Sequence, residues 1–195
     1  IHNIFSDGNP HTGSALLTWF SANPIYFINN TVADVNNGFW DHNWQPDTVS
    51  SFIVTNNIFS NVTNTSLRLS RMTSPSEPFQ SNYNLYQNPV IEWKNQKFNT
   101  LGDYQIESGQ GQNSLPGDPI FTNESTGDLT LLGGSLASAA GAPSTIYSLF
   151  TATYGLKINF GIQGQERPED AWDIGAFQRT HKALPSLPSG IFVKE

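Results

Sequence analysis

The chain has 195 residues, of which 13% are charged and 12% are aromatic, and its formal net charge at pH 7 is −7. This combination excludes a disordered chain, which would carry more charge and fewer rings, and it disfavours a nucleic-acid-binding protein, which needs a basic surface. The sequence has no apolar run near the roughly 20 residues of a membrane span, and it has no cysteine for disulfides or thiol chemistry.

Residues 1–88 are built on a repeat. An asparagine recurs without a gap at Asn3, Asn30, Asn57 and Asn84, which gives a constant 27-residue step. Apolar residues keep the same step two positions later, at Phe5, Val32, Phe59 and Tyr86, and acids or amides follow at Asp7, Asp34, Asn61 and Asn88. Four matches in several independent columns predict four stacked 27-residue coils.

The columns predict how such coils would be held together. Low charge with abundant Asn, Ser, Thr and Gly favours β structure with many turns, and a coil of this length suits three short strands. The apolar column should point inward, each side chain about 4.8 Å from its equivalent in the next coil. The asparagine column should lie at a left-handed turn, with each amide bonded to the amides above and below it.

The residues after the coils carry short motifs in a fixed order. They are Trp93, Leu101, Gly117–Phe121, Gly127–Leu129, Arg167–Pro168 and Asp173–Phe177. Together with the coil motif, this order resembles the C-terminal part of secreted bacterial right-handed parallel β-helix proteins, the superfamily of pectate lyases and chondroitinase-B-like lyases. The resemblance covers residues 1–178. It departs at Ser135-Leu136-Ala137 and Ala139-Ala140-Gly141, where the family usually has Ser-Pro-Ala and Asp-Ala-Gly.

The resemblance implies an all-β chain folded as a right-handed parallel β-helix, a solenoid of 27-residue coils. Residues 1–88 would form the coils, residues 89–178 an irregular, β-rich closing segment that caps them, and residues 179–195 a linker-like tail. It also implies a secreted or cell-surface location and a polysaccharide partner, with no nucleic acid and no membrane span. Because the chain starts within a repeat, we expect a C-terminal fragment whose second partner is the N-terminal remainder of the protein.

Candidate substrate-binding residues lie in the second and third coils. If Phe39 faces inward, strand alternation turns Trp40 and His42 outward, and Arg68 would point outward between two core leucines. The predicted set is Trp40, Asp41, His42, Trp44, Arg68 and Arg71. Aromatic faces suit sugar rings, and arginine binds carboxylates with two hydrogen bonds. In the competing interpretation, the tryptophans pack under a loop and the arginines pair with nearby acids.

Catalytic residues stay unassigned. A lyase needs a base and a group that neutralises the uronate carboxylate, roles that His42, Arg68 and Arg71 could fill, with Asp41 tuning His42. A glycoside hydrolase needs paired acids, for which Asp34 and Asp41 are the local candidates. Neither set forms a specific motif. Polysaccharide binding, with or without cleavage, is therefore the first hypothesis, and a non-catalytic cell-surface or adhesive stalk is the alternative.

No cofactor is evident from the sequence, and calcium is the one ion left open. Asp7 and Asp34 would lie one coil apart, close enough to share a cation. The competing interpretation makes this column a turn that accepts aspartate or asparagine, as Asn61 and Asn88 suggest. The sequence predicts no protein metal site beyond this.

Overall fold

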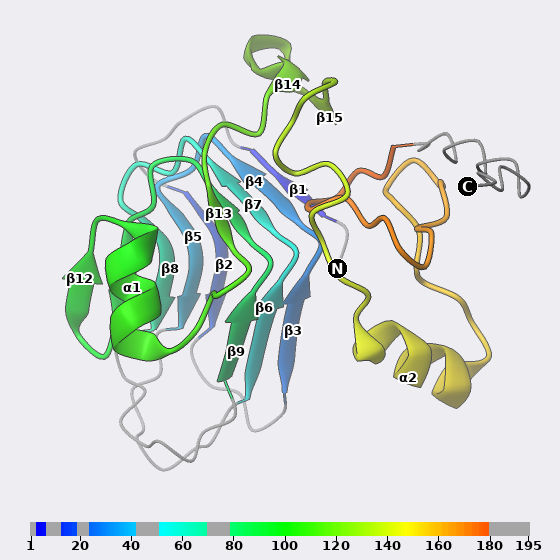
Figure 1. Cartoon of the computed structure of the whole chain (residues 1–195), viewed down its shortest axis with the longest axis horizontal. Coiled ribbons are helices and arrows are strands. Elements are labelled where there is room, and N and C mark those ends of the chain that lie inside the picture. The colour runs from blue at the N-terminus through cyan, green and yellow to red at the C-terminus, as the bar shows by residue number, and fades with distance from the viewer. Residues whose placement is uncertain (1–2, 7–12, 19–23, 42–50, 70–78, 180–195) are drawn as a thin grey trace, which may run out of the picture.

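A computed structural model describes residues 3–6, 13–18, 24–41, 51–69 and 79–179. Within these ranges the chain winds into a parallel β-solenoid with three stacked sheets (Figure 1). Sheet A contains β1 (Ile4–Phe5), β4 (Thr31–Ala33), β7 (Ile58–Ser60), β10 (Leu85–Tyr86) and β13 (Leu115–Pro116). Sheet B contains β2 (Ser14–Thr18), β5 (Asn37–Asp41), β8 (Thr65–Leu69), β11 (Ile91–Trp93) and β12 (Gln96–Phe98). Sheet C contains β3 (Ile25–Ile28), β6 (Phe52–Thr55) and β9 (Phe79–Asn82).

The chain visits sheets A, B and C in turn, and the predicted fold class is confirmed. Strands of successive coils pair in parallel, whereas β12 folds back antiparallel on β11. The described residues form three complete coils and the first two strands of a fourth, so the expectation of four full coils was too high. After the incomplete fourth coil, β13 adds one more parallel strand to sheet A. The chain leaves the repeat after β11, because the hairpin to β12 replaces the path to sheet C.

The 27-residue step holds in two of the three sheets. In sheet C, and from β1 to β10 in sheet A, paired residues such as Ile4 and Thr31 are 27 apart. The last step of sheet A, from Leu85 in β10 to Leu115 in β13, is 30. In sheet B, the inward residues Leu16, Phe39, Leu67 and Ile91 pair at steps of 23, 28 and 24. The connections on either side of sheet B therefore differ in length from coil to coil, while the turn between sheets C and A does not.

The coil interior is filled by the predicted apolar column. Val32, Phe59 and Tyr86 are fully buried, and the last two stack with ring centroids 5.1 Å apart and an angle of 6° between the planes. Phe39 and Leu67 of sheet B are fully buried in the same cluster. A column of like residues thus forms because parallel pairing without a register shift places equivalent side chains above one another.

The asparagine ladder is confirmed at the turn between sheets C and A. The side-chain oxygen of Asn57 accepts the backbone N–H of Asn30 at 2.9 Å and its side-chain amide at 3.0 Å. In turn, the backbone N–H and the side-chain amide of Asn57 donate to the side-chain oxygen of Asn84, at 2.9 and 3.0 Å. The ladder begins at Asn3 and ends at Ser114, whose hydroxyl accepts the backbone N–H of Asn84.

The left-handed backbone angle was predicted at the ladder asparagine, but it lies one residue earlier in the chain. It belongs to the residue before each ladder asparagine, with φ of 54° at Asn29, 57° at Asn56 and 52° at Tyr83. The ladder residue itself leads into a strand of sheet A. The preceding residue makes the turn, and this leaves the ladder side chain aimed along the stack.

The end of the coil stack is capped by β12 and α1 (Leu101–Ser108). Phe98, Leu101 and Tyr104 belong to the buried cluster of the coil interior. The hydroxyl of Thr100 accepts the N–H of Asp103 at the start of the helix. Figure 1 shows α1 beside β12 at this end of the stack.

The rest of the closing segment is less β-rich than expected. It contains the antiparallel pair β14 (Phe121–Asn123) and β15 (Asp128–Leu131), a 3₁₀ turn at Glu124–Thr126, and α2 (Thr145–Tyr154). This segment lies along the side of the solenoid: Ile174 packs with Ile58 and Leu85 on the outer face of sheet A.

The motif Asp173–Phe177 fastens this lateral contact. Gly175 has φ of 97°, and a Cβ there would lie 2.7 Å from Ile58 Cδ1 and 2.8 Å from Thr31 Oγ1. Its N–H donates to the carbonyl of Asn56 at 2.8 Å. Glycine is required because only glycine combines this backbone angle with so close an approach. The motif therefore clamps the side of the solenoid, while α1 closes its end.

Candidate functional site

Strand alternation brings several of the predicted residues to the outer face of sheet B. Leu67 and Leu69 are fully buried, and Arg68 between them has a side chain that is 30% exposed. Trp40 is partly exposed and pairs with Arg68 in register. The row continues to the neighbouring strands on both sides. We call it the outer row, and its members on the four parallel strands are Leu17, Trp40, Arg68 and Glu92. Lys97 of the antiparallel strand β12 pairs with Glu92 at the end of this row.

Contacts within the outer row centre on Arg68. Its guanidinium carbon lies 4.5 Å from the centroid of the Trp40 ring, and its Nε lies 2.9 Å from Oε2 of Glu92. The structure thus brings Trp40 and Arg68 together, as a ligand surface would require, and also pairs the arginine with an acid. Sequence reasoning missed Glu92: the alternation in Ile91-Glu92-Trp93 indicates that it points outward, but not that it lies next to Arg68.

Asp41 does not share the outer face. It follows Trp40 in β5, so its side chain leaves the strand on the opposite side. It is 5% exposed, and its Oδ1 accepts the hydroxyl of Thr18 at 2.9 Å. A buried carboxylate on the opposite side of the strand does not reach a sugar bound on the outer row. The other three predicted residues, His42, Trp44 and Arg71, lie outside the described residues.

The column proposed for calcium has the geometry of a turn. Asp34, Asn61 and Asn88 have φ of 54°, 48° and 56°, and the amide of Asn61 donates to the carboxylate of Asp34. Asp7 lies outside the described residues. Within the described ranges, no three His, Cys, Asp or Glu side chains gather closely enough to hold a metal ion.

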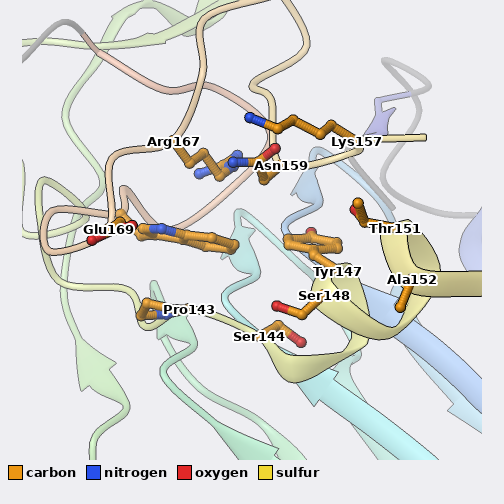
Figure 2. A pocket seen from close by; sticks show the side chains of 11 residues that line it. Pro143, Ser144, Tyr147, Ser148, Thr151, Ala152, Lys157, Asn159, Arg167 and Glu169 are labelled. Atoms are coloured by element: carbon orange, nitrogen blue, oxygen red, sulfur yellow. The ribbon is translucent and has the colours of Figure 1, made fainter. Parts of the chain in front are cut away.

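A pocket of about 480 Å³ lies beside α2, where sequence reasoning had placed nothing (Figure 2). Its lining includes Tyr147, Ser148, Lys157, Asn159, Glu169 and Trp172. The hydroxyl of Ser144 caps the start of α2 by accepting the N–H of Ile146. The walls come from a helix and from irregular chain, so neither a strand period nor the coil repeat could have revealed them.

Two stacked rings form the apolar wall of this pocket. Tyr147 and Trp172 have centroids 5.2 Å apart and planes 22° apart, and they pack with Ile28 of sheet C. The Tyr147 hydroxyl donates to Oδ1 of Asn29 at 2.9 Å. Burial raises the pKa of Tyr147, so this phenol stays protonated at neutral pH. The pocket is therefore built directly on the solenoid.

Arg167 lies behind the same wall and is 2% exposed. Its Nη1 donates to the carbonyl of Asp173 at 2.8 Å and its Nη2 to that of Gly175 at 2.7 Å. Its guanidinium carbon lies 5.6 Å from the Trp172 ring centroid. Burial lowers the pKa of Arg167 to about 10, which still leaves the group charged at neutral pH. The arginine thus holds the closing motif in shape and lines the pocket.

Comparisons of the chain with protein-family models, with curated proteins and with solved structures gave no match in any of the three. Neither helix in the described part of the chain has the length and apolar character needed to cross a membrane. The arguments about function therefore start from the outer row, the pocket and the motifs of the sequence.

Proposed function

We propose that this chain is a secreted or cell-surface protein of the pectate-lyase-like parallel β-helix type, and that its outer row on sheet B binds an acidic polysaccharide. In-register parallel strands set the outer-row residues side by side, about 4.8 Å from one strand to the next. Such a straight strip suits an extended polymer, whose repeating units would cross several coils.

The contact between Arg68 and Trp40 carries the proposal. A ring face at Trp40 suits the apolar face of a sugar, and a guanidinium 4.5 Å from that ring could pair with the carboxylate of a uronic acid. The described closing segment packs on sheet A and on Ile28 of sheet C, and the outer row takes no part in those buried clusters.

Cleavage is the less supported part of the proposal. A lyase reaction needs a base next to the neutralised carboxylate. Arg68 is assigned here to the carboxylate, so the base would have to come from His42 or Arg71. Appearance of unsaturated uronate on incubation with polygalacturonate, and its loss in His42→Ala, would support a lyase. If the wild-type protein gives no such product, this part of the proposal is wrong and polysaccharide binding alone is left.

One observation favours a structural stalk instead. Glu92 at 2.9 Å already balances the charge of Arg68, and Trp40 covers one side of its guanidinium, so the arginine is satisfied without a ligand. In that case the solenoid would serve as a non-catalytic, rigid surface or adhesive element, and the outer row would only stabilise it.

Titration calorimetry with a galacturonate oligosaccharide separates the two functions. Trp40→Ala should weaken binding about tenfold or more, because a stacking anchor is lost. Glu92→Gln should tighten it, because a neutral amide then replaces the carboxylate that pairs with Arg68 at 2.9 Å. Tyr26→Ala is the matched control, since Tyr26 is 39% exposed and lies outward on sheet C. Absence of wild-type binding, or equal losses in the Trp40 and Tyr26 variants, would refute the binding surface.

A further inference from the structure

We infer that the pocket beside α2 is a second binding site, which takes a single neutral sugar ring. This inference stands whether or not the outer row of sheet B binds a polysaccharide. The volume of about 480 Å³ lies in the range of roughly 300–1,000 Å³ that small-molecule sites occupy. Figure 2 shows polar side chains arranged around it, with Asn159 and Lys157 on one side and Ser144 and Ser148 on the other.

The lining combines an apolar wall with donors and acceptors, which is what a polyhydroxylated ring needs. Tyr147 and Trp172 form the wall and are held rigidly by their stacking. Ser148 and Glu169 are exposed at the pocket, so both a hydroxyl and a carboxylate can reach a ligand. Asn159, whose side-chain amide donates to Glu166 at 3.2 Å, is also part of the lining. Sugar hydroxyls can both donate and accept, and so match a mixed lining.

The charges of the pocket favour a neutral sugar over an acidic one. Lys157 already pairs with Glu166, at 3.3 Å between Nζ and Oε1. Glu169 adds a carboxylate to the lining that would repel a uronate. Arg167, the other cation of the lining, is buried, and both terminal nitrogens of its guanidinium donate to oxygens of the protein. Both cations of the lining are therefore already engaged within the protein.

Saturation-transfer NMR tests the site with methyl glucoside, N-acetylglucosamine and galacturonate as separate probes. We expect transfer to at least one neutral sugar, and none to galacturonate in Trp40→Ala, which lacks the proposed anchor of the outer row. Ser148→Phe fills the pocket from an exposed position of α2 and should weaken binding at least tenfold. Thr153→Phe is the matched control, because Thr153 is exposed on the same helix but is not part of the lining.

Two further variants keep the test decisive if Ser148→Phe disturbs the helix. Glu169→Gln, made in the Trp40→Ala background, removes the repelling carboxylate and should let galacturonate bind, with the neutral sugars retained. Trp40→Ala should leave neutral-sugar binding unchanged, which distinguishes this site from the surface on sheet B. The inference is wrong if neither neutral sugar shows transfer, if galacturonate alone binds the Trp40→Ala variant, or if Ser148→Phe and Thr153→Phe bind the neutral sugar equally.

Discussion

The turn between sheets C and A and the outer face of sheet B belong to the same coils but follow different rules. At the turn, the 27-residue step is kept and the same amide recurs in each coil. On sheet B the step changes from 23 to 28 to 24, and the outer row contains an aliphatic, an aromatic, a basic and an acidic residue. A ladder of side-chain-to-backbone bonds requires one residue type in every coil, whereas an outward strand position accepts any side chain. The turn therefore constrains the residue type in every coil, whereas the outward positions of sheet B can hold side chains suited to a ligand.

The largest effect should come from breaking the ladder in its middle. Asn57→Ala removes the side-chain oxygen that accepts from Asn30. It also removes the side-chain amide that donates to the side-chain oxygen of Asn84 and to the carbonyl of Phe27. We expect the free energy of unfolding to fall by about 4 kcal/mol, measured by urea denaturation. Asn99→Ala, at an exposed site, should change it little. A loss below about 1 kcal/mol for Asn57→Ala would mean that the ladder does not hold the coils.

The second-largest effect on stability should come from the motif Asp173–Phe177, whose Gly175 donates its N–H to Asn56 at this turn. Gly175→Ala places a methyl group 2.7 Å from Ile58 Cδ1 at a backbone angle that alanine disfavours. We expect a loss of about 3 kcal/mol, seen as a lower melting temperature. Gly102→Ala in α1 meets nothing within 4 Å and should instead stabilise by up to about 1 kcal/mol. Equal melting temperatures for the wild type and Gly175→Ala would contradict the clamp.

The smallest effect on stability should come from sheet B. Arg68→Ala breaks an ion pair whose side chains are 30% and 17% exposed, so unfolding should become easier by less than about 1 kcal/mol. Lys157→Ala breaks a more exposed pair with Glu166 and should change the free energy of unfolding even less. If Arg68→Ala lowers the free energy of unfolding as much as Asn57→Ala does, the outer row has a structural role, which favours the stalk hypothesis.

The sequence reveals the regular part of this fold and little of the irregular part. The columns of Asn30 and Val32 predict the ladder and the core because their chemistry repeats in every coil. The left-handed residue was misplaced because Asn29 and Asn30 are both asparagine, and only backbone geometry distinguishes them. The pocket was not predicted because Tyr147 and Trp172 meet through a single, non-repeating contact.

In the candidate site, alternation correctly placed Trp40 and Arg68 in one outward row. Asp41 lies on the opposite side of β5 from them, since adjacent residues of a strand face opposite sides. The partner of Arg68 was harder to foresee. Glu92 joins the row only because the step from β8 to β11 is shorter than the regular repeat of the coils, which the repeat itself does not predict.

The most direct test of the account is an NMR titration of isotope-labelled protein with a galacturonate oligosaccharide. If sheet B is the binding face, resonances of the Trp40 indole and of the backbone at Arg68 and Glu92 should shift together and saturate at one affinity. Those of Tyr26 on sheet C should stay unchanged. Shifts confined to residues 143–172, or no shifts at all, would contradict the claim.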